Sequence, residues 1–173
     1  MAAVIGFDKE KIMEICRQTQ AQVANFNAPD QIVITGKAQN VANAAKIIQA
    51  QGAKRVIPLD VSGAFHSHLM ALAVPKFENV LKQARFRTGD FPVVSNVDGQ
   101  PTVDPEKIRQ NLARQITSSV QWVDSVQYIA AQGITDFLEI GPGNVLKGLI
   151  RKINPALQVY NIRTPQDIDN LPF

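Results

Sequence analysis

The first 61 residues alternate between two hydrophobic periods, and this alternation limits the folds that the chain can adopt. Apolar residues recur either at helical spacing or in short runs typical of strands. The strand-like segments are residues 2–6, 22–27, 31–35 and 55–61, and the helix-like segments are residues 12–23 and 37–51. Turn residues Ala28-Pro29-Asp30 separate the second and third strands. The sequence therefore predicts the order β-α-β-β-α-β.

This order is that of a ferredoxin-like subdomain, and the pattern closes near Val61. The chain has 173 residues, a length that suits one ordinary domain or two small ones. We therefore predict a first domain at residues 1–61 and a second at residues 62–173. In the second, helix-like and strand-like segments alternate, which indicates the α/β class.

Two prolines help to place the helices of the second domain. Pro75 lies within the apolar helical pattern of residues 69–81 and either kinks that helix or begins its second part. Asp104 followed by Pro105 is a typical helix start. The remaining predicted helices are residues 104–116, 122–132 and 144–153, and the predicted strands are residues 92–97, 134–140 and 157–162.

Composition excludes several classes of protein. Hydrophobic residues make up 45% of the chain and charged residues 19%, so it is not a disordered chain. The net charge is only +3, and no stripe of basic and aromatic residues is present, so we expect no nucleic-acid partner. No apolar run approaches the roughly 18 residues that a membrane span needs, so we expect no membrane association.

Cysteine usage favours a reducing compartment. Cys16 is the only cysteine, and it falls on the predicted inward face of a helix, where a core role is more typical than a reactive one. The start of the chain lacks the basic region and the length of a signal peptide. We therefore expect a cytoplasmic protein.

The two histidines of the chain, His66 and His68, lie between a predicted strand and a predicted helix. Loops of this kind often carry catalytic groups in α/β proteins. A histidine base working at neutral pH would have to be one of these two, although an ordinary loop histidine is the alternative. The pair has no carboxylate or cysteine cluster nearby, so we expect no metal site.

Other familiar catalytic motifs are missing. No serine lies in a Gly-x-Ser-x-Gly elbow, and the glycines at positions 141, 143 and 148 do not fit the dinucleotide-binding spacing. Gly141-Pro142-Gly143 is best interpreted as a tight turn, although a helix that begins there is also a candidate anion site. Asn25, Asn27 and Gln115 have ordinary structural interpretations near a turn and a helix end. Spacing alone leaves the function open.

Five sequence blocks together resemble the malonyl-CoA:acyl carrier protein transacylase family. They are residues 25–36 (NFNAPDQIVITG), 61–70 (VSGAFHSHLM), 92–97 (PVVSNV), 114–122 (RQITSSVQW) and 139–149 (EIGPGNVLKGL). The resemblance runs from the first residues to about Ile153. It implies a ferredoxin-like subdomain inserted in an α/β-hydrolase-like acyltransferase core.

The resemblance also implies roles for individual residues. His66 would be the base that activates a catalytic serine, and the backbone carbonyl of Gln115 would orient it. Phe65 would select malonyl over methylmalonyl groups by steric exclusion. Asn25 and Asn27 would lie near the cleft between subdomains. The substrates would be malonyl-CoA and acyl carrier protein, with no cofactor, in fatty-acid or polyketide synthesis.

Measured against that family, the chain looks like a C-terminal portion. The serine elbow Gly-His-Ser-Leu-Gly, the arginine for the malonyl carboxylate and the loop completing the oxyanion hole would precede Met1. We therefore expect the isolated chain to be inactive, either as a fragment of a longer chain or as one half of a split enzyme, in which case a separate N-terminal half would be a further partner. One alternative is a non-catalytic module that binds acyl carrier protein. Another is a free-standing hydrolase, for which Ser67 is the nearest nucleophile.

Overall fold

The computed structural model describes residues 1–172 and divides into two units, Met1–Ser125 and a second from Val126 onward. The first contains β1 (Ala2–Ile5), α1 (Lys9–Thr19), β2 (Gln22–Ala28), β3 (Gln31–Thr35), α2 (Ala38–Ala50), β4 (Arg55–Pro58), the 3₁₀ helix η1 (His68–Ala73), α3 (Val74–Gln83), β5 (Val93–Val94), β6 (Pro101–Thr102) and α4 (Pro105–Arg114). Helix α5 (Trp122–Ala131) crosses the division. The second contains β7 (Asp136–Ile140), α6 (Val145–Ile153), β8 (Gln158–Ile162) and the 3₁₀ helix η2 (Pro165–Asn170).

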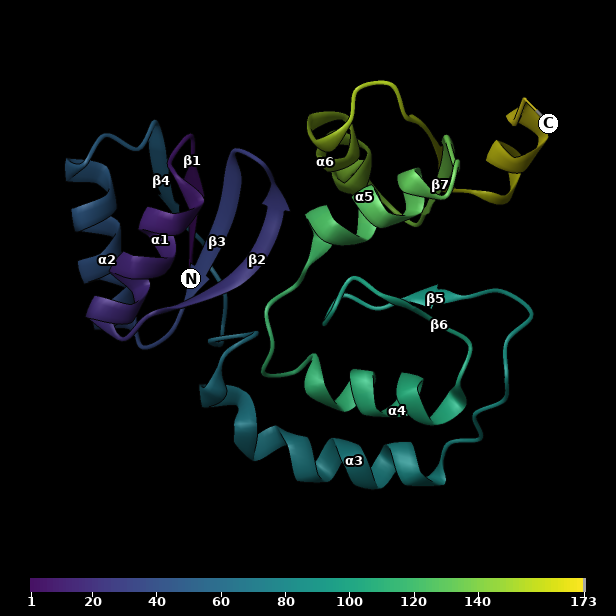
Figure 1. The fold of residues 1–173 in the computed structure, drawn as a ribbon, viewed down its shortest axis with the longest axis horizontal. Coiled ribbons are helices and arrows are strands. Elements are labelled where there is room, and N and C mark those ends of the chain that lie inside the picture. Colours follow the sequence, from purple (N-terminus) through teal and green to yellow (C-terminus); the bar gives the residue numbers. More distant parts are fainter. Residues whose placement is uncertain (173) are drawn as a thin grey trace. The chain divides into compact units, whose positions relative to one another are not determined.

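The first four strands form one antiparallel sheet in the order β2-β3-β1-β4 (Figure 1). The predicted order β-α-β-β-α-β is confirmed. Helices α1 and α2 pack on one face of this sheet because strand residues alternate between its two faces. Their core contains Ala2, Val4, Ile12, Ile15, Cys16, Ala21, Ile32, Ile34, Val41, Ala44, Ile48 and Ala53.

The end of α1 differs from the prediction. The periodicity extended the helix to Val23, but α1 ends at Thr19 and Val23 lies on β2. Gln20 adopts a left-handed conformation, with φ +57°, and its backbone N–H donates to the carbonyl of Arg17. A left-handed residue at this position ends a helix and redirects the chain, which hydrophobic spacing does not reveal.

Pro75 begins a helix and does not kink one. The segment from His68 to Ala73 is a 3₁₀ helix, and α3 starts at Val74 with Pro75 in its first turn. Proline suits the first turn because its missing N–H has no helical partner there. Of the two interpretations drawn from the sequence, the second is confirmed.

The strand predicted at residues 92–97 is wrong in length. Only Val93 and Val94 pair, with β6. The chain then turns sharply, since the N–H of Gly99 donates to the carbonyl of Ser95 at 2.8 Å and Gly99 has φ +63°. The short partner β6 was not predicted.

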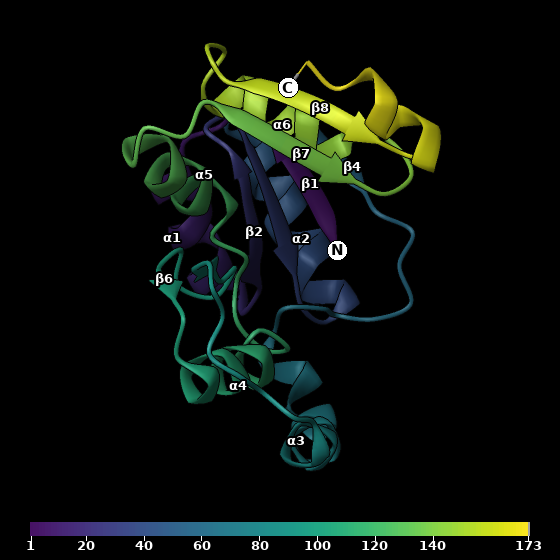
Figure 2. The same ribbon diagram turned by 90° about the vertical axis from the view of Figure 1, so that its right-hand side faces the viewer.

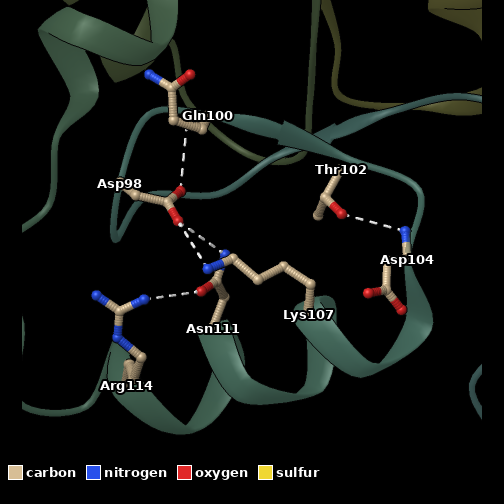
Figure 3. Close-up of polar contacts among 7 residues, drawn as sticks. All are labelled: Asp98, Gln100, Thr102, Asp104, Lys107, Asn111 and Arg114. Carbon is tan, nitrogen blue, oxygen red and sulfur yellow. Dashed lines mark hydrogen bonds and ion pairs between the residues drawn. The ribbon is translucent and has the colours of Figure 1, made fainter.

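Asp98 fastens this hairpin to helix α4, as Figure 3 shows. Its carboxylate accepts hydrogen bonds from the backbone N–H of Gln100 (3.2 Å) and the side-chain amide of Asn111 (3.2 Å). The Nζ of Lys107 lies 3.9 Å away, and Asn111 in turn accepts from Arg114 at 3.2 Å. Asn111 is buried, so its polar atoms need these partners. The network fixes the direction in which α4 ends.

In the second unit β7 and β8 run parallel, side by side, with α6 connecting them (Figure 2). The predicted strand, turn, helix and strand of residues 134–162 are confirmed to within about two residues at each end, whereas η2 was not predicted. The two compact units adjoin in sequence between Ser125 and Val126, and the domain boundary expected after residue 61 stays a prediction. None of the helices in residues 1–172 is long and apolar enough to cross a membrane.

Substitution of Ile48 should measure how much the first core contributes. Ile48 is fully buried, and Ile48→Ala should lower the free energy of unfolding by about 2–5 kcal/mol through lost burial and the cavity that remains. Leu72→Ala is the control: Leu72 is 95% exposed, so a change within about 0.5 kcal/mol is expected. Urea denaturation followed by circular dichroism tests both, and equal losses would contradict the core assignment.

Candidate functional site

The turn between β4 and η1 brings His66 against the segment that follows α4. The Nδ1 atom of His66 lies 3.0 Å from the carbonyl oxygen of Gln115 and 3.2 Å from that of Ser118. Carbonyl oxygens only accept hydrogen bonds, so Nδ1 carries the proton in this arrangement. The neutral ring then has its lone pair on Nε2. This is the protonation state that a general base needs.

Two predicted site residues, 49 positions apart, thus meet in space. Gln115 caps α4 at its C-terminus, where the last carbonyls of a helix have no helical partner. The carbonyl of Gln115 is one of the two that His66 contacts. The second acceptor, Ser118, was missed, because nothing in a sequence shows which way a backbone carbonyl points.

The backbone of His66 is strained. Its φ is +58°, a conformation that residues other than glycine adopt infrequently and that costs on the order of 1–3 kcal/mol. The hydroxyl of buried Ser67 closes the turn by donating to the carbonyl of Ala64 at 2.6 Å and accepting from the N–H of Leu69 at 3.3 Å. Ser67 is therefore a structural residue in a closed turn, which counts against its use as a nucleophile.

Phe65 precedes His66 and remains 42% exposed. Its ring packs on Gly63, because a Cβ added to that glycine would lie 3.4 Å from Cζ of Phe65. The ring of Phe65 therefore lies in ordinary van der Waals range of position 63. The residue directly before His66 in the sequence thus has an accessible aromatic side chain.

Asn25 and Asn27 lie on β2, the strand that receives the segment after α4. Asn25 forms an isolated bridge with Val120, whose N–H donates to Ala24 at 2.8 Å and whose carbonyl accepts from Phe26 at 2.9 Å. Within residues 1–172, neither asparagine side chain is hydrogen-bonded to His66. Their predicted position near a substrate cleft stays a prediction.

Cys16 is confirmed as a core residue. It is buried, and burial raises the pKa of its thiol to about 11, so almost no thiolate forms at neutral pH. The described part of the chain contains no group of three or more His, Cys, Asp and Glu side chains that could hold a metal. His68 is engaged elsewhere, with Gln22.

A carboxylate of the chain itself occupies the helix start after Gly141-Pro142-Gly143. Glu139 accepts from the backbone N–H groups of Leu146 and Lys147, both at 2.9 Å, and from the Asn161 amide at 2.7 Å. These N–H groups are the ones that an external anion would use. An intramolecular carboxylate, that of Glu139, therefore takes the place of an external anion at this turn, and the sequence analysis did not single out Glu139.

The charge state of Glu139 follows from these contacts. Burial acts to raise its pKa, but the backbone N–H groups of Lys147 and Leu146 and the Asn161 amide outweigh it, so the pKa is lowered from its ordinary value of 4.5. The carboxylate thus stays ionised at the positive end of α6.

Comparison with known proteins relates both sequence and fold to one family. The chain is 41% identical to malonyl CoA-acyl carrier protein transacylase of Staphylococcus aureus strain COL, over 97% of this chain and 56% of the relative. It is 39% identical to the Bacillus subtilis protein of that name, over 98% and 55%. The chain is homologous to malonyl CoA-acyl carrier protein transacylases. It spans about half the length of these curated relatives, consistent with a C-terminal portion.

Solved structures agree. One match comes from the structure of a type II PKS acyl-carrier protein in complex with its malonyl-transacylase. The matched chain has a TM-score of 0.93 and 37% identity, over 98% of this chain and 56% of its own length. The transacylase of Xanthomonas oryzae matches with a TM-score of 0.92 and 36% identity, over 98% and 55%. The chain therefore has the α/β fold of malonyl transacylases along the portion that it covers.

A second similarity covers a smaller part. Residues 1–50 match the family model of the KH domain. KH domains clamp a nucleic-acid backbone with a Gly-x-x-Gly loop. Gly6 and Gly36 are the only glycines in residues 1–50, so that loop is missing. The matched residues thus lack the loop by which KH domains hold nucleic acid.

Glu139→Gln should reveal the electrostatic part of the contact with α6. Since the folded pKa is lowered, the carboxylate stabilises the second unit above its unfolded pKa, and this contribution is lost as the pH falls through the folded pKa. Glu139→Gln should therefore be less stable than the parent at neutral pH, and the difference should shrink below about pH 4.

To measure this difference, each protein is equilibrated in urea at a series of pH values. Hydrogen exchange of residues 136–162 is then measured in a short pulse at one fixed labelling pH. Glu78→Gln, an exposed change on α3, is the matched control and should have no such effect. A pH-independent loss in Glu139→Gln would contradict the electrostatic explanation.

Proposed function

We propose that this chain supplies the histidine base for malonyl transfer from malonyl-CoA to the phosphopantetheine thiol of acyl carrier protein. The nucleophilic serine would come from polypeptide outside these 173 residues. The observation that carries the proposal is the contact of His66 Nδ1 with the carbonyls of Gln115 and Ser118 at 3.0 and 3.2 Å. The homology to malonyl transacylases supports the choice of reaction.

In the proposed mechanism the Nε2 atom of His66 takes the serine hydroxyl proton as the serine oxygen attacks the thioester carbonyl of malonyl-CoA. The resulting imidazolium then gives that proton to the departing CoA sulfur, leaving a malonyl-serine ester. In the second half, Nε2 takes the proton of the phosphopantetheine thiol, whose sulfur attacks the ester, and returns it to the serine oxygen. The two carbonyls stabilise the positive ring in both halves, the role of the acid in a Ser-His-Asp triad.

The fold assignment belongs to the same proposal. We assign residues 1–61 to a ferredoxin-like subdomain and residues 62–173 to part of an α/β-hydrolase-like acyltransferase core. The antiparallel order β2-β3-β1-β4 and the element order β-α-β-β-α-β support the first assignment. The parallel pair β7 and β8, joined through α6, supports the second.

Phe65 is proposed to set acyl specificity, with Asn25 and Asn27 lining the substrate cleft. The exposed ring of Phe65, beside the base, would occupy the space that a methyl branch on the malonyl group needs. Acyl carrier protein and malonyl-CoA are the proposed partners, with no cofactor. The solved complex of a similar transacylase with an acyl-carrier protein supports the first of them.

Reconstitution tests the base assignment. The chain is produced with the N-terminal segment of the Bacillus subtilis relative that it does not cover, and malonyl transfer to acyl carrier protein is followed by intact mass. Neither piece alone should transfer, whereas the pair should. His66→Ala should slow the pair by about 10²–10⁴-fold. Asn43→Ala, an exposed change on α2, is the control.

Each other outcome has a defined meaning. Transfer by the chain alone, with a malonyl ester on one of its own serines, would overturn the missing-serine proposal and favour a free-standing enzyme. An inactive pair in which the chain still binds acyl carrier protein would favour the non-catalytic binding module. Full activity of His66→Ala would exclude His66 as the base.

Phe65→Ala tests specificity in the same pair. Removing the ring should improve use of methylmalonyl-CoA relative to malonyl-CoA by about 10–200-fold in kcat/KM, the usual range for one methyl-sized difference. Phe91→Ala, which removes another exposed aromatic ring, is the matched control and should leave the ratio unchanged. An unchanged ratio in Phe65→Ala would contradict the steric explanation.

A further inference from the structure

We propose that Gln22 is a positioning residue, which clamps the His66 turn to strand β2 and so keeps the proton of His66 on Nδ1. Its Oε1 atom accepts a hydrogen bond from the backbone N–H of His68 at 3.0 Å. The same oxygen lies 2.5 Å from Nδ1 of His68, which must therefore donate as well. Two donors of one residue thus meet a single acceptor on β2. The proposal rests on the proposed role of His66.

Gln22 provides a hydrogen-bond acceptor at the start of the 3₁₀ helix η1. His68 is the first residue of η1, and the first N–H groups of a helix have no partner within it. Gln22 supplies that partner for the N–H of His68, which lies two residues after the strained backbone of His66. A left-handed residue of this kind persists only where its surroundings hold it. Ser67 closes the turn from within, and Gln22 ties it to the sheet.

Strand β2 also binds the segment whose carbonyls contact His66. The hydroxyl of Ser119 donates to the carbonyl of Val23 at 2.6 Å. Val120 adds two main-chain hydrogen bonds, with Ala24 and Phe26. Residues 22–26 of β2 therefore carry both partners: the turn with His66, and the segment with the carbonyls of Gln115 and Ser118.

The arrangement links Gln22 to the chemistry of His66. If the turn moves away from β2, the two carbonyls no longer reach Nδ1 and cease to select its protonated form. A ring with its proton on Nε2 has no lone pair there to act as a base. Within residues 1–172 the side-chain oxygen of Gln22 bonds to His68 and not to the His66 ring, so its effect passes through the turn.

The test is the tautomer of His66 in the full chain without substrate. Nitrogen-15 shifts of neutral imidazoles report which nitrogen carries the proton, and the chain has only two histidines. The parent should show His66 protonated at Nδ1. Gln22→Leu should raise the population of the Nε2–H form of His66 about tenfold. The net contribution of one ordinary hydrogen bond changes an equilibrium constant by about this factor. Gln22→Glu keeps an acceptor oxygen and should restore the parent tautomer of His66, although the signals of His68 will change beside the new charge.

Two further variants complete the design. Gln22→Asn, one methylene shorter, cannot reach His68 and should behave as Gln22→Leu; it also replaces that variant if leucine prevents folding. Gln39→Leu removes an exposed glutamine whose side chain bonds Asn43 on α2, and it should leave His66 unchanged. An unchanged His66 tautomer in folded Gln22→Leu and Gln22→Asn would overturn the proposal. So would a shift in Gln22→Glu equal to that in Gln22→Leu.

The outcomes separate this inference from the proposed function. The tautomer is measured without malonyl-CoA or acyl carrier protein, so an inactive reconstituted pair leaves the clamp result intact. A parent His66 with its proton on Nε2 would overturn the clamp proposal even if the pair transfers malonyl groups.

Discussion

The hydrogen bonds between strand β2 and the segment after α4 are the contact on which the candidate site depends. Val120 joins β2 through two main-chain hydrogen bonds, and Ser119 adds a third through its hydroxyl. Because this segment follows the end of α4, anchoring it also fixes the carbonyls of Gln115 and Ser118. Asp98 holds the other end by fastening α4 to the β5–β6 hairpin. The acceptors for His66 thus sit on a segment restrained at both ends.

His66 shows how such restraint is used. Its left-handed backbone is unfavourable by itself, yet the turn is closed by Ser67 and its imidazole meets two carbonyl oxygens. Backbone carbonyls cannot be protonated at physiological pH, so they orient the ring without competing for its proton. A carboxylate would do the same with a full negative charge. The geometry therefore orients the ring with Nδ1–H toward the two carbonyls, and a neutral ring held in this way has its lone pair on Nε2.

Much of the fold followed from the sequence where local rules were sufficient. Hydrophobic periods gave the order of the first six elements, and Asp104 with Pro105 marked the start of α4. The sequence was less informative where the result depended on a distant partner. Residues 92–97 look like a strand, but only two of them find a partner in β6. The turn at Gly141–Gly143 was a candidate anion site on its sequence. In the folded chain Glu139, from the preceding strand, occupies the helix start.

The sequence by itself determined the order of the first six helices and strands and the buried place of Cys16, and five blocks of resemblance singled out His66 and Gln115 as candidates. The element order and the place of Cys16 follow from residue type and local spacing, whereas the candidacy of His66 and Gln115 follows from the resemblance. Tertiary structure alone decided that Ser118 would be a second acceptor, that Ser67 would be closed within a turn and that Gln22 would meet His68. Each of these is a hydrogen bond whose formation depends on backbone direction and on segments far apart in the chain. No residue pattern specifies where a carbonyl will point until the chain around it has folded.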